Sequence, residues 1–299
     1  MVDADGGTPA GRDGLGVLLR SPGLVVIAGG PGAGRTTTLR ALADEFRGPV
    51  FIGGGLATLR HLPGMALARA VRARLPDRDA PLAAEAVRAR VGEGLLVVDD
   101  VHHADPLSLA VLPLLADVCR VLVAIRTPGG LPAATERALR DAATTWTVLR
   151  GLAADQARTL ARQVAPTLDD RALEAVLARA GGNPLAVRVL AGRAAAHGGV
   201  PAVEPGADEP DTPTGALDRA VAAAIADLPR PARTALAALG LLGRPASPAL
   251  LGPGVEELAE AGWVTVDADV VTPSPRYLAE VAAAVIPDTE RTGLHRRLA

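Results

Sequence analysis

The stretch LVVIAGGPGAGRTT, residues 24–37, decides the fold. Its first five residues form a continuous apolar run, which is typical of a parallel strand buried on both faces. A glycine-rich turn follows, with Gly29 and Gly34 at the spacing of G-x-x-x-x-G-K-[ST], and we expect a helix from Thr36 onward. Glycines permit positive φ, so successive backbone N–H groups can turn inward around a phosphate, and the helix start adds its positive dipole end. The stretch therefore predicts a phosphate-binding loop.

The whole turn is expected to contact the ligand. The predicted binding residues are Gly29, Gly30, Pro31, Gly32, Ala33, Gly34, Arg35, Thr36 and Thr37. Thr36 is also placed to offer its hydroxyl to Mg²⁺. The alternative is an ordinary glycine-rich turn between a strand and a helix. A second motif, further along the chain, favours the phosphate-binding interpretation.

Position 35 departs from the motif, which has lysine there. A guanidinium keeps the charge and pairs well with phosphate, but it is wider and planar and does not simply replace a compact ammonium. We therefore expect binding to be retained and hydrolysis to be weak or absent. All 31 basic residues of the chain are arginine, so drift in a GC-rich genome explains Arg35 as well as selection does.

The second motif is LLVVDDVHHAD, residues 95–105, an apolar strand that ends in two carboxylates. Beside a phosphate loop, Asp99 is expected to hold the Mg²⁺ shell. Asp100 should point elsewhere and is a candidate general base that orients an attacking water. The alternative is that both acids form a solvated strand end. His102 and His103 lack the i, i+4 spacing of a helix-borne zinc site and no thiol pair accompanies them, so we do not predict zinc.

Further apolar runs at 50–52, 121–125 and 146–149 alternate with helical segments such as 65–74 and 106–118. This alternation predicts βαβ units and, over residues 1–150, an α/β domain with a five-stranded parallel sheet. The fourth strand ends in Arg126, at the edge where ligands of open α/β sheets bind. Arg126 is therefore a candidate sensor of a γ-phosphate, the alternative being an arginine solvated at a strand end.

The second half of the chain changes character. Residues 151–196 predict a helical lid domain of three helices, with Asp155 and Asp169 as N-caps. Residues 197–215 have the composition of a linker. In residues 216–299, helices near 216–228 and 231–241, a segment near 247–261 and a hairpin at 263–273 predict a winged-helix-like α+β domain.

Composition narrows the function classes. The chain has 299 residues, a net charge of −2, 49% hydrophobic and 21% charged residues, as expected of a globular protein. Five aromatic residues are too few for the stacking platforms of single-strand binders. Residues 216–299 hold eight arginines against ten acids, so we expect no DNA binding by the winged-helix-like domain itself.

The expected compartment is the cytoplasm. Cys119 is the single cysteine, and the first residues lack the pattern of a signal peptide. The most apolar window, 106–125, is interrupted by Pro113, Asp117 and Arg120, so we predict a buried helix and a strand there and no membrane partner. The ending ERTGLHRRLA has no glycine or proline to close a helix, so we expect the chain to be cut from something longer.

Taken together, GGPGAGRTT, LLVVDDVHHADPLSL, VLVAIRTP, GGNPLAV and the last 25 residues resemble the large ATP-binding LuxR-type regulators of actinomycetes. These belong to the STAND group of signal-transduction ATPases, which have an AAA-like P-loop NTPase fold. The resemblance spans nearly all of the chain and implies ATP or ADP with Mg²⁺ as ligands. It also implies that Pro184 contacts adenine. In such proteins a C-terminal helix-turn-helix binds DNA, and the resemblance here does not include that part.

Three functions follow from these observations. The leading one is a nucleotide-controlled switch in which the bound ATP or ADP biases self-association. The second is an active NTPase or small-molecule kinase, against which Arg35 weighs. The third, a transcription factor that reads DNA with its own winged helix, ranks last because that domain is acidic.

Overall fold

The computed structural model divides the chain into two compact units. The first holds the chain up to Leu149 except Pro31–Ala33, and the second holds Pro31–Ala33 and the chain from Arg150 onward. The structure describes residues 12–127, 130–197, 221–222, 225–226, 228–260 and 263–298.

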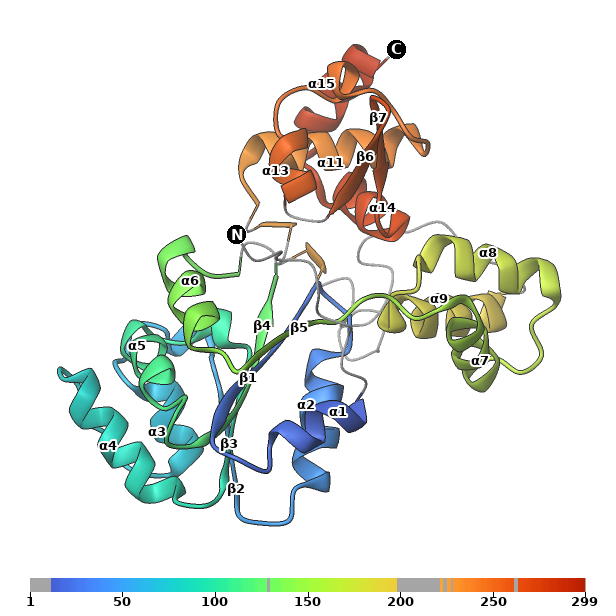
Figure 1. Cartoon of the computed structure of the whole chain (residues 1–299). Helices are drawn as coiled ribbons and strands as arrows, with labels where there is room; N and C mark the ends of the chain where they lie inside the picture. Colours follow the sequence, from blue (N-terminus) through green and yellow to red (C-terminus); the bar gives the residue numbers. More distant parts are fainter. Residues whose placement is uncertain are drawn as a thin grey trace. The chain divides into compact units, whose positions relative to one another are not determined.

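The first unit is an α/β domain (Figure 1). Its strands are β1 (Gly23–Gly29), β2 (Val50–Gly54), β3 (Leu95–Asp99), β4 (Arg120–Arg126) and β5 (Thr145–Val148). Its α-helices are α1 (Arg12–Leu18), α2 (Arg35–Glu45), α3 (Met65–Val71), α4 (Ala80–Val91), α5 (Pro106–Leu114) and α6 (Ala133–Ala142), and short 3₁₀ turns lie at Ala57–Leu59 and Val101–His103. The predicted five-stranded parallel sheet is confirmed.

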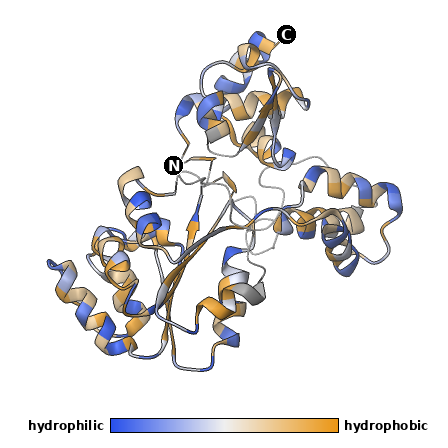
Figure 2. Ribbon diagram, in the orientation of Figure 1, coloured by the Kyte–Doolittle hydropathy of each residue, from blue (hydrophilic) through white to orange (hydrophobic). Residues whose placement is uncertain are grey.

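The sheet has the order β2-β3-β4-β1-β5, with helices on both faces. Alternate residues of each strand point to opposite faces, so the sheet carries two cores. Val26, Val98 and Val123 belong to the core shared with α3–α6, whereas Val25 and Val97 belong to the core shared with α1 and α2. Burial on both faces explains the uninterrupted apolar runs of the strands, which Figure 2 shows in the hydrophobic colour.

Strand register brings the predicted polar residues to one edge. Gly29, at the end of β1, is paired with Arg126 at the end of β4, and Asp99 at the end of β3 is paired with Gly54. Thr127 follows Arg126, and its backbone N–H donates to the oxygen of Gly29 at 3.2 Å. The carboxyl ends of the strands thus meet beside the start of the glycine loop.

Two helices of the first unit are shorter than predicted. The helix expected over 65–74 ends at Val71, because Arg72 adopts a left-handed conformation with φ of 51°. The helix expected over 106–118 ends at Leu114, one residue after Pro113. Proline has no backbone N–H to donate within a helix, and its ring clashes with the preceding turn. The apolar window from 106 to 125 is therefore a helix and a strand, as predicted. Within the described part of the chain, no helix combines the length and the apolar character needed to cross a bilayer.

The second unit combines helices with one β-hairpin. Its helices are α7 (Ala154–Val164), α8 (Asp170–Ala180), α9 (Pro184–His197), α11 (Arg230–Leu242), α12 (Pro248–Leu251), α13 (Val255–Glu260), α14 (Arg276–Val285) and α15 (Asp288–Leu298). The predicted hairpin is confirmed: β6 (Val264–Asp267) pairs antiparallel with β7 (Val270–Pro273) through Ala268 and Asp269, both at positive φ. One continuous core joins all these elements.

Of the two predicted N-caps, one is right. The Asp169 side chain accepts a hydrogen bond from Ala172 N at 2.7 Å and caps α8. The prediction for Asp155 is wrong, because α7 already begins at Ala154, with Ala153 as its N-cap and Asp155 in its first turn. At this N-terminus the Gln156 side chain accepts a hydrogen bond from the backbone N–H of Ala153, and Asp155 takes no part in that hydrogen bond.

The predicted domain limits, 1–150, 151–196, 197–215 and 216–299, stay predictions. The linker lies outside the described residues except for His197, and the helix predicted near 216–228 is described only in fragments. What the structure adds is that α7–α9 and α11–α15 share one compact unit.

Candidate nucleotide-binding site

The glycine loop leaves β1 and enters α2, as its motif requires. Gly34 is the N-cap of α2 and has φ of 91°, a value that side chains disfavour. A Cβ atom built on Gly30 or on Gly34 meets no described atom within 4 Å, so open space adjoins the backbone at both positions. Open space beside a helix N-terminus is the feature that an anionic ligand needs. Thr36 is half-buried and Thr37 is exposed in the first turn of α2.

Arg35 lies with its guanidinium turned back toward the end of the sheet. Its Nη1 donates a hydrogen bond to the backbone oxygen of Gly29 at 2.5 Å, and its Nη2 lies 3.8 Å from Oδ1 of Asp100. The side chain is only 13% exposed. Burial lowers the pKa of Arg35, and the negative charges of Asp100 and Asp99 act in the opposite sense. Arg35 is thus a partly desolvated cation in the residue that directly follows Gly34.

Asp99 and Asp100 have different surroundings. Asp99 Oδ1 accepts a hydrogen bond from the backbone N–H of Asp100 at 2.8 Å. Asp100 has φ of 45°, which turns its side chain toward Arg35. Burial raises the pKa of Asp100 and the charge of Asp99 raises it further, while Arg35 lowers it. A carboxylate with a raised pKa suits the predicted role of general base, which stays a prediction.

His102 is buried next to Asp100 in the first unit. Its side chain is 4% exposed, with Nε2 3.9 Å from Asp100 Oδ1, and its ring centroid lies 4.1 Å from that of His103. Burial, together with the charges of His103, Arg126 and Arg35, lowers the pKa of His102 to about 2. The imidazole is therefore neutral. Among the described residues, no group of three or more ligand-type side chains has the geometry of a metal site.

Arg126 belongs to the same charged cluster. It lies opposite Gly29 in the sheet, and its charge affects the pKa of Arg35, Asp100 and His102. The structure thus brings together four of the side chains that the sequence singled out, namely Arg35, Asp99, Asp100 and Arg126. The role of Arg126 as a γ-phosphate sensor stays a prediction.

The middle of the loop, Pro31–Ala33, groups with the second unit, where it contacts the start of α9. Asn183 Nδ2 donates to the backbone oxygen of Pro31 at 2.8 Å, and Leu185 N lies 3.4 Å from the oxygen of Gly32. Pro184 is the first residue of α9, so the proline predicted to contact adenine directly follows the residue that holds the loop.

Sequence reasoning missed Asn183, although the motif GGNPLAV contains it. A signal was present, because Asn before proline is the pattern of an N-cap followed by position N1. The reach of its amide to a loop 152 residues earlier in the chain has no counterpart in the local pattern. Also missed was Asp105, a buried carboxylate that accepts from Gly64 N, Ala66 N and Ser108 N and so ties α3 to α5.

The residues present fit a nucleotide with Mg²⁺. The loop offers open space at Gly30 and Gly34, a helix N-terminus and a buried cation, which together suit phosphates. Thr36 and Asp99 offer the hydroxyl and carboxylate oxygens that Mg²⁺ takes alongside phosphate oxygens. These two groups are the ones that would hold the cation.

Comparison with solved structures identifies the fold. The Walker-type ATPase PABY2304 of Pyrococcus abyssi has a TM-score of 0.54 at 12% identity, over 89% of this chain and 92% of that one. The chain has a P-loop NTPase fold. A STAND protein with a tetratricopeptide repeat sensor, PH0952 from Pyrococcus horikoshii, gives 0.39 at 16% identity over 99% of this chain, which spans 45% of that protein's length. The RuvB Holliday junction branch migration motor of Thermotoga maritima gives 0.47 at 15% identity, over 87% of this chain and 88% of that one.

No family model matches the sequence, and no curated protein matches it either. At identities this low, the structural likeness concerns the P-loop fold and does not extend to substrates or partners.

Proposed function

We propose that this protein is a nucleotide-controlled switch that binds ATP or ADP with Mg²⁺ in its glycine loop and hydrolyses ATP weakly or not at all. The observation that carries the proposal is the position of Arg35. Its side chain is only 13% exposed, its guanidinium contacts Gly29 and Asp100, and its backbone directly follows Gly34, beside which open space lies. A cation in this position favours a bound phosphate, because an anion replaces the solvation that burial removes.

The loop residues have separate parts in binding. Backbone N–H groups from Gly30 to Thr36 would receive the phosphates, with Arg35 as their charged partner. Thr36 and Asp99 would hold Mg²⁺, which neutralises phosphate charge when it is bound. Asp100 is close enough to Arg35 to compete with phosphate for the guanidinium.

Weak hydrolysis follows from the same geometry. Phosphoryl transfer needs a positive charge placed against the oxygens that gain charge in the transition state. The Arg35 guanidinium is held from one side by the Gly29 oxygen and from the other by Asp100. A planar group restrained in this way can bind phosphate in the ground state. It cannot move to stay against the phosphoryl oxygens that gain charge in the transition state.

The wider context of the switch rests on the sequence resemblance to LuxR-type STAND regulators. In our proposal, the nucleotide state changes conformation and self-association, and the β6-β7 hairpin with its helices is a winged-helix-like domain. In this proposal DNA binding belongs to a C-terminal helix-turn-helix, as in the regulators that the sequence resembles. The compartment we propose is the cytoplasm.

The first test is direct. The purified protein is denatured and any released nucleotide is identified by chromatography, and calorimetry then measures ATP and ADP binding with and without Mg²⁺. We expect a released adenine nucleotide or binding below millimolar concentration. If no nucleotide is released and neither ATP nor ADP binds the folded protein at millimolar concentration, the proposal is wrong.

A phosphate-release assay separates the switch from an active NTPase. We expect little or no turnover of ATP by the natural sequence. Brisk turnover that is unchanged in Arg35→Ala would show that this side chain does not govern the phosphates and would favour the enzyme.

A further inference from the structure

Asn183 makes two kinds of hydrogen bond at once. Its Oδ1 accepts from the backbone N–H groups of Leu185 and Ala186, each at 3.1 Å, and thereby caps α9. Its Nδ2 donates to the backbone oxygen of Pro31 at 2.8 Å. Only a side chain with both a donor and an acceptor can make this pair of contacts, and an amide has both.

The loop is shaped to receive this side chain. Gly32 has φ of 73°, and a Cβ atom there would lie 2.7 Å from Asn183 Oδ1 and 3.0 Å from Leu185 Cβ. Glycine at position 32 therefore allows a close approach that any side chain would prevent. Leu185 N adds a longer contact to the oxygen of Gly32, at 3.4 Å.

The segment before Asn183 is fixed as well. Gly181 and Gly182 both adopt positive φ, of 52° and 75°, and Gly182 accepts a hydrogen bond from Leu152 N at 2.7 Å. A Cβ on Gly182 would lie 2.7 Å from the oxygen of Leu152. The amide of Asn183 is thus presented from a rigid turn, which lowers the entropy cost of holding Pro31.

We propose that Asn183 is a positioning residue of the phosphate-binding loop. Its Nδ2 sets the conformation of Pro31–Ala33, which lies between the two open positions Gly30 and Gly34. The loop then keeps the shape that phosphate needs, and the amide of Asn183 has both its partners only when Pro31–Ala33 is in place. This inference rests on the proposed function for its ligand but not for the contact itself.

The test replaces the amide NH₂ group of Asn183 with a carboxylate oxygen. Asn183→Asp keeps the acceptor that caps α9, with a charge that suits a helix N-terminus, but it loses the donor and places a carboxylate against the Pro31 oxygen. The matched control is Asp169→Asn, the reverse exchange at the N-cap of α8, where the described hydrogen bond stays within that helix. Both variants keep a cap, so any difference between their melting temperatures beyond about 2 °C comes from the lost Pro31 contact and not from capping.

The expected results differ for the two variants. ADP affinity should fall about 10-fold in Asn183→Asp, because one hydrogen bond is lost and an unpaired carbonyl faces a carboxylate. It should change less than about 2-fold in Asp169→Asn. A purely structural N-cap would move both variants alike, so equal ADP affinities for the two variants would overturn the proposal.

Hydrogen exchange without nucleotide makes the test independent of the proposed function. In Asn183→Asp, the peptide spanning residues 30–39 should exchange faster than in the natural protein, whereas the peptide over 170–180 should not change. If the natural protein binds no adenine nucleotide, the proposed function fails, and the exchange of residues 30–39 still decides the role of Asn183. Equal exchange of this peptide in the two proteins would show that Asn183 does not hold the loop.

Discussion

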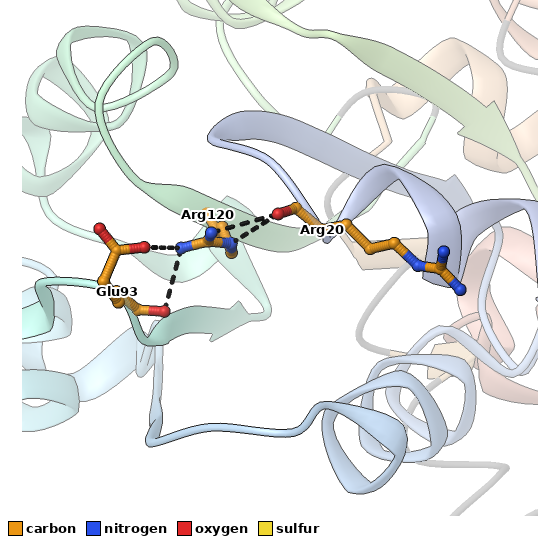
Figure 3. Close-up of polar contacts among 3 residues, drawn as sticks. All are labelled: Arg20, Glu93 and Arg120. Carbon is orange, nitrogen blue, oxygen red and sulfur yellow. Dashed lines mark hydrogen bonds and ion pairs between the residues drawn. The ribbon is translucent and has the colours of Figure 1, made fainter.

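Two arginines at opposite ends of the same sheet show how similar burial can serve different purposes. The Arg35 and Arg120 side chains are 13% and 15% exposed. Arg120, at the start of β4, donates from all three nitrogens, to the backbone oxygen of Arg20 and to the backbone and carboxylate oxygens of Glu93 (Figure 3). Its distances to these oxygens are 3.0–3.3 Å, and its donors converge on fixed backbone.

Arg35 lacks that enclosure. Its described partners are one backbone oxygen and one carboxylate at 3.8 Å, and open space begins at the neighbouring Gly34. The difference separates a structural arginine from one that suits a ligand. A pocket of about 760 Å³ does open at the amino end, lined in part by Val17, Arg20, Phe46 and Arg120, but Arg120 is already committed within the protein.

The largest effect we expect concerns Arg35. Arg35→Ala should weaken ADP binding about 50-fold, because the phosphates lose a charge-assisted partner. Arg35→Lys is the control and should stay within about 3-fold, since the charge is kept. If misfit of the guanidinium limits hydrolysis, Arg35→Lys should also release phosphate faster. Calorimetry and a phosphate assay measure both, and unchanged ADP affinity in Arg35→Ala would remove the contrast with Arg120.

Arg120 should show the opposite pattern. Arg120→Met keeps the aliphatic stem but leaves the Arg20 and Glu93 oxygens without their donor, which should lower the free energy of unfolding by about 2 kcal/mol. ADP affinity should stay within about 2-fold of the natural value. The control is Glu93→Gln, which alters only an exposed partner and should cost less than about 0.5 kcal/mol. Denaturant titration measures stability, and an affinity loss in Arg120→Met would contradict the assignment.

His102 gives the carboxyl end of the sheet a pH dependence. Its folded pKa of about 2 lies below the unfolded value of 6.5, because burial and the charges of His103, Arg126 and Arg35 disfavour the protonated ring. The unfolded state therefore takes up the proton first, and stability should fall as the pH drops below 6.5, by about 1.4 kcal/mol per pH unit. The window for the test is pH 6.5 to 5, and the raised pKa of Asp100 acts on stability in the opposite sense.

The control for this prediction is a second histidine. His102→Gln should flatten the slope of unfolding free energy against pH, whereas His61→Gln changes an exposed imidazole and should leave the slope as it is. An unchanged slope in His102→Gln would mean that the ring is protonated in the folded protein.

Much of this comparison could be predicted from the sequence. The five strands, their parallel sheet and the placement of Arg35, Asp99 and Arg126 at one edge follow from apolar runs that end in polar residues, since parallel strands share their carboxyl edge. The hairpin follows equally from alternation. These features are local in sequence, or are linked by one topological rule.

The remaining features depend on contacts that no local pattern encodes. In the sequence, Arg120 is only an interruption of an apolar window, because its partners Arg20 and Glu93 are distant in the chain. Asn183 lies in a recognisable motif, yet its contact with Pro31 requires the positive φ of Gly32 and the turn at Gly182. The N-cap predicted at Asp155 lies two residues from the true one, Ala153. Helix ends are uncertain by one or two residues, so the local pattern cannot choose between these two positions.

The smallest effect concerns Asp99, and it tests whether the carboxyl end is built for a cation as well as for phosphate. Asp99→Asn keeps the oxygen that accepts from Asp100 N, so the backbone turn at the strand end is preserved while the charge is lost. Because a carboxylate attracts Mg²⁺ and an amide does so weakly, the gain in ADP affinity on adding Mg²⁺ should shrink about 5-fold, or about 1 kcal/mol. Affinity without Mg²⁺ should stay equal or rise slightly, since a negative charge near the phosphates is removed. Calorimetry with and without Mg²⁺ gives both values, and Asp117→Asn, an exposed change outside the cluster, controls for net charge. An Mg²⁺ gain that is the same in Asp99→Asn as in the natural protein would show that the cation is held without this strand end, and the carboxyl end would then be a phosphate site alone.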